Sequence, residues 1–139
     1  MVELSGRSAI VTGAAVGLGN SYAQALAAEG VKVAVCDVRE EIDDVVKSLN
    51  VIGHEAIGWQ GDVSNPEFVL QVVEGATQAF GSIDILINNA GVWGASVADD
   101  DLDKSLDDYE KIVGTNLKAE YLFGRAVIPI MISQGTGAD

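Results

Sequence analysis

The strongest constraint on the fold is a repeated alternation of short apolar runs with longer amphipathic stretches. An apolar run at 9–11 is followed by a helical pattern over 18–29 and a second apolar run at 31–35. The pattern continues with helices predicted near 40–49 and 66–80, strands near 55–60 and 83–88, and a long helix from 103 to about 132. Alternating strands and helices with right-handed crossovers form parallel sheets. Residues 1–139 therefore predict a single α/β domain, a doubly wound parallel sheet of about four strands with helices on both faces.

The charge of the chain excludes several classes of partner. It carries 8 basic and 21 acidic residues, a net charge of −13, which opposes binding to nucleic acid or to anionic membrane surfaces. Its apolar runs fall far short of the roughly 20 residues that cross a bilayer, and no basic signal region opens the chain. A cytoplasmic location is expected. A single cysteine and a single histidine argue against an intrachain disulfide and a metal site.

A glycine-rich turn follows the first predicted strand, with the sequence Thr12-Gly13-Ala14-Ala15-Val16-Gly17-Leu18-Gly19. Glycine lets the backbone approach a pyrophosphate closely, and the N-terminus of the next helix attracts an anion. Taken alone, the glycines also fit simple tight packing. Asp37 follows Gly19 by 18 residues at the end of the second strand, where a carboxylate accepts hydrogen bonds from an adenosine ribose. This context favours a dinucleotide site.

The spacing Gly-x-x-x-Gly-x-Gly resembles the turn of the short-chain dehydrogenase/reductase family. Three further segments resemble this family in the same order: Asp62-Val63, then Asn88-Asn89-Ala90-Gly91, then Asn116 in the long helix. The resemblance covers essentially the whole chain. It implies a Rossmann-type fold and an oxidoreductase that transfers hydride between a nicotinamide and a small-molecule alcohol or ketone.

The resemblance also implies roles for individual residues of the glycine turn and the second strand. Those that hold the cofactor pyrophosphate are Thr12, Gly13, Gly17, Leu18 and Gly19. Asp37 binds the ribose hydroxyls and selects NAD, because it would repel the 2′-phosphate of NADP. Val16 stands where NADP-binding relatives carry a basic residue. Arg39 has two interpretations, a contact with adenine or phosphate and a solvated side chain at a strand end.

The later motifs complete the expected site. Asp62 resembles the acceptor of the adenine amino group, with the Val63 backbone beside it, although a turn or helix-capping aspartate is the alternative. Asn88 and Asn89 resemble the motif that ties the fourth strand to its neighbours, while Ala90 and Gly91 pass close to the cofactor riboses. Asn116 resembles the helix asparagine that supports a water and proton path to the catalytic lysine. The alternative for Asn116 is a polar side chain that bonds a neighbouring loop.

The catalytic serine, tyrosine and lysine of this family are not identifiable. The Tyr-x-x-x-Lys signature is absent, and its nearest imitation, Tyr121 with Arg125, lies only five residues beyond Asn116. We expect the cofactor-binding half of an NAD-dependent oxidoreductase, incomplete at its C-terminus and inactive alone. The alternative is a non-catalytic nucleotide-binding or self-associating module. A methyltransferase is a weaker possibility, which Asn-Asn-Ala-Gly disfavours.

The sequence also predicts a homo-oligomer. A fourth strand over 83–87 would leave an unpaired edge, and such edges recruit other chains. The long helix carries more apolar surface than one sheet face covers, at Leu117, Leu122, Phe123, Val127, Ile128 and Met131. In the family that this chain resembles, the equivalent helix packs against its counterpart in a dimer.

Overall fold

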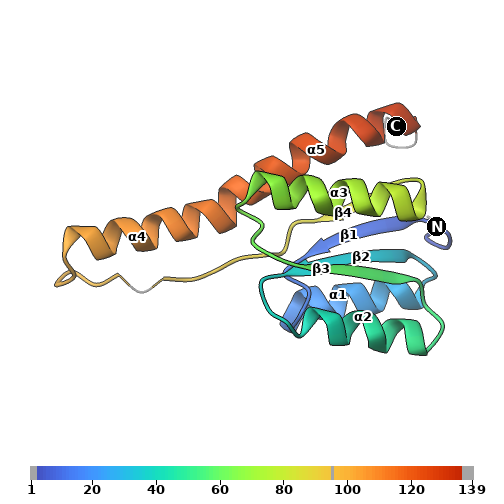
Figure 1. Cartoon of the computed structure of the whole chain (residues 1–139), viewed down its shortest axis with the longest axis horizontal. Coiled ribbons are helices and arrows are strands. Elements are labelled where there is room, and N and C mark those ends of the chain that lie inside the picture. Colours follow the sequence, from blue (N-terminus) through green and yellow to red (C-terminus); the bar gives the residue numbers. More distant parts are fainter. Residues whose placement is uncertain (1–2, 95, 136–139) are drawn as a thin grey trace.

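A parallel sheet forms the centre of the computed structural model, which describes residues 3–94 and 96–135 (Figure 1). Its strands are β1 (Ser8–Thr12), β2 (Lys32–Asp37), β3 (Ala56–Gln60) and β4 (Ile85–Ile87), in the order β3-β2-β1-β4. All three strand pairings are parallel, with Ile10 opposite Ala34 on β2 and Leu86 on β4. The predicted α/β architecture of about four parallel strands is confirmed.

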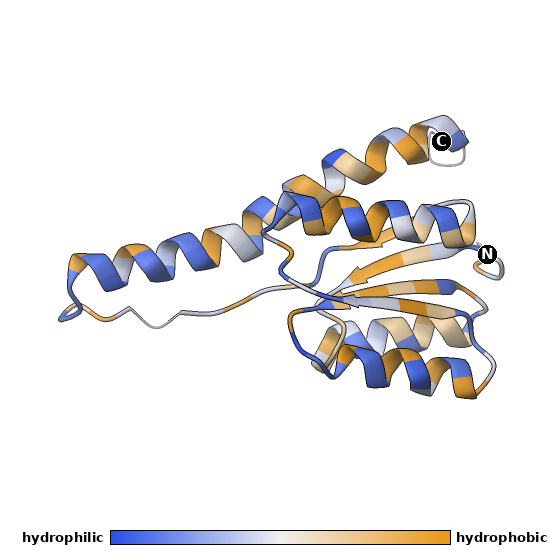
Figure 2. Ribbon diagram, viewed as in Figure 1, coloured by the Kyte–Doolittle hydropathy of each residue, from blue (hydrophilic) through white to orange (hydrophobic). Residues whose placement is uncertain are grey.

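Helices cover both faces of the sheet (Figure 1). On one face lie α1 (Gly17–Ala28) and α2 (Ile42–Val51), and on the other lie α3 (Pro66–Phe80) and α5 (Ala119–Gln134). Side chains alternate along β1, so that Ile10 packs with α3 and α5 while Ala9 and Val11 pack on the opposite face. Both faces of the central strands β1 and β2 are thus buried, whereas β3 and β4 at the edges are partly buried. Figure 2 shows the strands as mostly hydrophobic.

Local signals fix the bounds of α3 to the residue. Asn65 caps its N-terminus, because its side-chain oxygen accepts from the backbone N–H of Glu67 at 2.9 Å. Pro66 occupies the first helical position, where a missing N–H costs nothing. Gly81 ends the helix in the left-handed conformation with φ +80°. The observed span, Pro66–Phe80, is the predicted one.

Strand β4 is shorter than predicted. Ile83 is buried but lies outside the ladder, since its backbone is held by a side chain instead of a strand. Its N–H donates to Gln134 Oε1 at 2.9 Å, and its carbonyl accepts from Gln134 Nε2 at 3.0 Å. This pair fixes the end of α5 against the start of β4.

The long C-terminal helix is not continuous α-helix. It consists of α4 (Leu102–Val113), a π-helical segment η1 (Gly114–Lys118) and α5. Figure 1 shows α4 projecting away from the sheet together with the loop that precedes it. Leu106 and Tyr109 on α4 are consequently exposed, although they lie at helical spacing. Pro129 lies inside α5, which continues to Gln134. Within the described residues, no helix is long and apolar enough to cross a bilayer.

Candidate functional site

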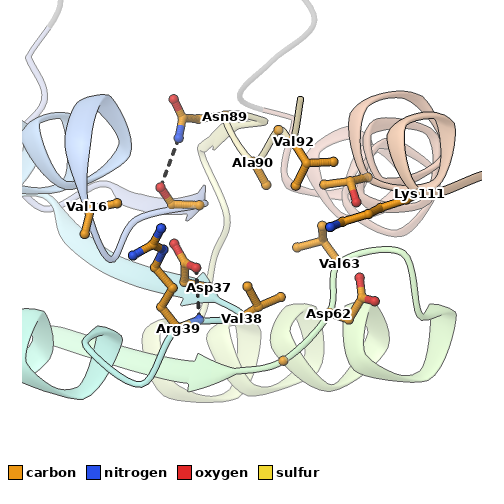
Figure 3. A pocket seen from close by; sticks show the side chains of 14 residues that line it. Val16, Asp37, Val38, Arg39, Asp62, Val63, Asn89, Ala90, Val92 and Lys111 are labelled. Atoms are coloured by element: carbon orange, nitrogen blue, oxygen red, sulfur yellow. Dashed lines mark hydrogen bonds between the residues drawn. The ribbon is translucent and has the colours of Figure 1, made fainter. Parts of the chain in front are cut away.

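A cleft of about 490 Å³ opens at the carboxyl ends of the strands (Figure 3). Fourteen residues line it: Gly13, Val16, Asp37, Val38, Arg39, Gly61, Asp62, Val63, Asn89, Ala90, Gly91, Val92, Lys111 and Thr115. Twelve of these residues lie at or after the carboxyl ends of the four strands. The other two are Lys111 on α4 and Thr115 on η1. Because β1 lies between β2 and β4, the chain order reverses here, and ligands of open α/β sheets bind at such switch points.

Two of the three glycines in the turn, Gly13 and Gly19, are packed too tightly to carry a side chain, whereas a Cβ atom at Gly17 would meet nothing within 4 Å. A Cβ atom at Gly13, which has φ +66°, would lie 2.7 Å from Ala90 Cα. A Cβ atom at Gly19 would lie 2.1 Å from the Gly13 carbonyl oxygen and 2.5 Å from Asn89 Nδ2. The tight-packing interpretation of these glycines therefore accounts for Gly19, whereas Gly13 also forms part of the cleft wall.

The N-terminus of α1 lies at the same turn. Val16 precedes the helix in an extended conformation and offers no side-chain cap, and the first turn holds no acidic residue. Gly17 and Leu18 are exposed there. The first N–H groups of a helix have no intrahelical acceptor and carry its positive dipole end. This end of α1 can accept an anion such as a phosphate.

Thr12 joins the glycine turn to the segment after β4. Its hydroxyl accepts from the backbone N–H groups of Asn89 and Ala90, both at 3.0 Å. Asn89 Nδ2 donates two bonds in return, to the carbonyl oxygens of Thr12 and Gly13, both at 3.1 Å. Figure 3 draws the bond to Gly13. Asn89 thus ties the fourth strand to the first, as the resemblance implied. Asn88 is exposed and does not line the cleft.

Asp37 ends β2 in the wall of the cleft and is 9% exposed. Its Oδ2 accepts from the backbone N–H of Ala15 at 3.0 Å, and its Oδ1 accepts from the N–H of Arg39 at 3.1 Å. Since each carboxylate oxygen has two lone pairs, each keeps one for a ligand. The same contacts fix the glycine turn against β2. Arg39 lines the cleft, and its guanidinium lies 3.9 Å from the Glu41 carboxylate.

Asp62 and Val63 line the cleft beyond β3. Asp62 Oδ1 accepts from the N–H of Ser64 at 2.8 Å, which is the turn-stabilising bond that the alternative interpretation expected. Among the described residues, Asp62 Oδ2 accepts no hydrogen bond. One carboxylate oxygen therefore holds the turn while the other is available to a ligand, so the two interpretations of Asp62 are compatible.

Asn116 lies in η1 and bonds a neighbouring loop. Its Oδ1 accepts from the N–H of Val92, and its Nδ2 donates to the Val92 carbonyl, both at 2.8 Å. This pair anchors the segment after β4 to the C-terminal helices. Asn116 does not line the cleft itself. The alternative interpretation of Asn116, a polar side chain that bonds a neighbouring loop, describes these two hydrogen bonds. The residue lies in a π-helical segment, and such segments are frequent at functional sites.

Sequence reasoning missed Lys111 and Thr115, which α4 and η1 bring to the cleft. Val38, Gly61 and Val92 were also not singled out, although each adjoins a predicted site residue. Tyr121 is 65% exposed and does not line the cleft. Cys36 is buried in β2, and burial together with the neighbouring Asp37 charge raises its pKa to about 12, so its thiol is not a nucleophile.

The sequence comparisons agree with the motifs. A sequence model of the short chain dehydrogenase family matches residues 7–138. The chain belongs to the short-chain dehydrogenase family. It is 35% identical over 139 residues to a 3-oxoacyl-[acyl-carrier-protein] reductase of Synechocystis, covering 99% of this chain and 55% of the relative. An uncharacterised oxidoreductase of Mycobacterium tuberculosis is 41% identical over 131 residues, or 94% of this chain and 53% of the relative.

Solved structures of short-chain dehydrogenases share the fold. One from Burkholderia phymatum in complex with NAD superimposes with a TM-score of 0.88 at 34% identity, covering 96% of this chain and 47% of that one. A metagenomic short-chain oxidoreductase in complex with NADP gives a TM-score of 0.84 at 32% identity, covering 98% and 61%. The chain spans about half the length of the curated relatives it matches. One of these neighbouring structures thus contains NAD and the other NADP.

Proposed function

We propose that this chain is the cofactor-binding part of an NAD-dependent short-chain dehydrogenase. The observation that carries the proposal is the Asp37 carboxylate, which lies in the wall of the cleft beside the glycine turn. A cleft of about 490 Å³ is within the range of small-molecule and cofactor sites, about 300–1,000 Å³. A bound nicotinamide would exchange hydride with an alcohol or ketone carbon.

The residues around the cleft fit the parts of a dinucleotide. The open N-terminus of α1, with Gly17, Leu18 and Gly19, provides N–H donors for the pyrophosphate. Asp37 retains acceptor capacity for the ribose hydroxyls, and Asp62 Oδ2 for the adenine amino group. Ala90 and Gly91 line the cleft after β4, and the Thr12 hydroxyl fixes this segment by accepting from the backbone N–H groups of Asn89 and Ala90.

We expect the chain to bind NAD more tightly than NADP, by roughly 1–3 kcal/mol. A 2′-phosphate would meet the Asp37 carboxylate, and the ribose would lose a hydroxyl that can donate to it. Val16 supplies no positive charge at the turn. Replacing Asp37 with asparagine removes the negative charge and should reduce the difference in binding free energy between NAD and NADP. Calorimetry with each cofactor at constant salt measures this difference.

Asp62→Asn is the matched control, since it removes the same charge from the adenine end of the same cleft. Asp62→Asn should weaken the binding of both NAD and NADP and leave the ratio of their dissociation constants unchanged. Equal or tighter binding of NADP by the natural sequence would contradict the assignment of NAD and would point to Arg39 as a phosphate ligand.

We also propose that the chain self-associates through its C-terminal helices. Of the apolar residues expected there, Phe123 and Val127 are buried against the sheet, whereas Leu117 and Ile128 are exposed. Strand β4 forms one edge of the described sheet and pairs with β1 alone. Exposed apolar groups and an open strand edge both favour association. A second copy of the chain is the partner that these features fit.

Light scattering at micromolar concentration should give the mass of a dimer or a larger assembly. Leu117→Glu should shift the population towards the monomer because it places a charge in the proposed contact. Val51→Glu is the control, since Val51 is also exposed but lies at the end of α2 on the opposite face of the sheet. A strictly monomeric mass for the natural sequence would contradict self-association.

A further inference from the structure

Lys111 is a charged residue of the cleft that no motif of the sequence singles out. It lies near the end of α4, and Figure 3 shows its side chain extended from the helix into the cleft, towards Val63. Thr115 lies four residues further along and lines the same cleft. Residues four apart share one face of a helix, so this face of the C-terminal helices forms the wall opposite Asp37.

The position of this lysine is notable in a chain of this charge. The sequence has 8 basic residues against 21 acidic ones, and Lys111 and Arg39 are the two basic residues among those that line the cleft. Arg39 lies 3.9 Å from the Glu41 carboxylate. In the part of the chain that the structure describes, Lys111 forms no ion pair within 4.0 Å, even with Asp107 or Asp108 on the preceding turn. Its ammonium group is therefore available to a ligand.

Asp62 provides the complementary group on the same side of the cleft (Figure 3). Its Oδ1 is used by Ser64, and its Oδ2 is open among the described residues. An open carboxylate oxygen and an open ammonium group together offer one acceptor and one donor. Adenine presents the matching pair, an amino donor beside a ring-nitrogen acceptor. A base with a carbonyl in place of the amino group would instead direct an acceptor at Asp62.

We propose that Lys111 is a further specificity-determining residue of the cofactor site and donates a hydrogen bond to a ring nitrogen of adenine. This inference rests on the proposed function and adds a ligand contact from α4 to it. Asp62 and Lys111 then recognise neighbouring atoms of one base from two segments, the turn after β3 and helix α4. The methylene groups of Lys111 cover the base at the mouth of the cleft, as long amphipathic side chains do.

Lys111→Met tests the charge, because methionine keeps most of the apolar stem and is a good helix former. We expect the dissociation constant for ADP-ribose, measured by calorimetry at 0.15 M salt, to rise about tenfold, since a hydrogen bond from a charged group is lost. The loss should persist at 0.5 M salt, because a direct contact is screened less than long-range attraction. Lys118→Met is the control, because this substitution also removes one positive charge. Lys118 is exposed on η1 and does not line the cleft.

The outcomes separate the two proposals. If the natural sequence binds neither ADP-ribose nor NAD at millimolar concentration, the proposed function is wrong and this inference with it. If ADP-ribose binds and Lys111→Met leaves its affinity unchanged, only the role of Lys111 is wrong. An equal loss in Lys118→Met, or a loss that vanishes at 0.5 M salt, would show that Lys111 acts through its long-range field and would overturn the proposed contact.

Discussion

Replacing Gly19 with alanine is expected to lower the free energy of unfolding by about 2–4 kcal/mol, from overpacking together with a broken hydrogen bond. The added Cβ would lie 2.1 Å from the Gly13 carbonyl oxygen and 2.5 Å from Asn89 Nδ2. Neither group can move freely, since the Gly13 N–H is bonded to the Cys36 carbonyl at 2.8 Å and Asn89 Nδ2 is bonded to Gly13. Urea unfolding followed by circular dichroism measures the change.

Gly124→Ala is the matched control for this substitution. Gly124 also lies within a helix, and the only described atom near its added Cβ would be Ile128 Cδ1 at 3.9 Å. Alanine is favoured over glycine inside helices by up to about 1 kcal/mol, so this variant should be as stable as the natural sequence or more stable. A Gly19→Ala protein with unchanged stability would show that the glycine turn is loosely packed.

A polypeptide of these 139 residues is expected to show no turnover of alcohols or ketones, even where it binds NAD. A positioned general acid or base contributes about 10²- to 10⁴-fold in rate, or roughly 3–5 kcal/mol of barrier. The fourteen described residues that line the cleft include no tyrosine and no serine. Asn116, the one residue expected to support catalysis, uses both ends of its amide on the Val92 backbone. NADH absorbance against a broad panel of alcohols and ketones provides the test.

Tyr121→Phe is the control for that assay. Tyr121 is 65% exposed and stands outside the cleft, so its phenol should make no difference. Activity that survives repurification of the natural chain and disappears in Tyr121→Phe would contradict this account of the site. Activity that persists in both proteins, and whose rate per amount of chain stays constant across independent preparations, would also contradict this account; a rate that varies between preparations would indicate a contaminating enzyme.

Much of the fold is readable from the sequence because its signals are local. Asn65, Pro66 and Gly81 define α3 through their own hydrogen bonds and dihedral angles, so no tertiary information is needed. The start of β4 is different, because the backbone of Ile83 is bonded to the side chain of Gln134, 51 residues away, and not to a neighbouring strand. The prediction of one long helix from 103 to about 132 misses the π-helical segment η1. The apolar spacing runs through η1, and periodicity alone does not report a change in hydrogen-bond pattern.

In the candidate site, too, the local features could be predicted from the sequence and the contacts between distant residues could not. The glycine turn, Asp37, Asp62 and the segment around Asn89 each adjoin the end of a strand, and the ends of parallel strands meet at one edge of the sheet. Their proximity was therefore predictable. Lys111 reaches the cleft from α4, after a loop of fourteen residues that no turn signal positions. The pairing of Asn116 with Val92 fixes this approach, and it is a contact that a single sequence does not reveal.

The hydrogen bonds around Thr12 have a consequence for the order of folding. They join β1 to residues 77 and 78 positions later in the chain, whereas β1, α1 and β2 form from neighbouring residues. Closing such a long loop costs entropy before any contact offsets it, and non-local pairings form slowly. A refolding chain would regain its helices before it regains the cleft. The ability to bind a nucleotide is thus a property of the completed topology, acquired only when the first and fourth strands meet.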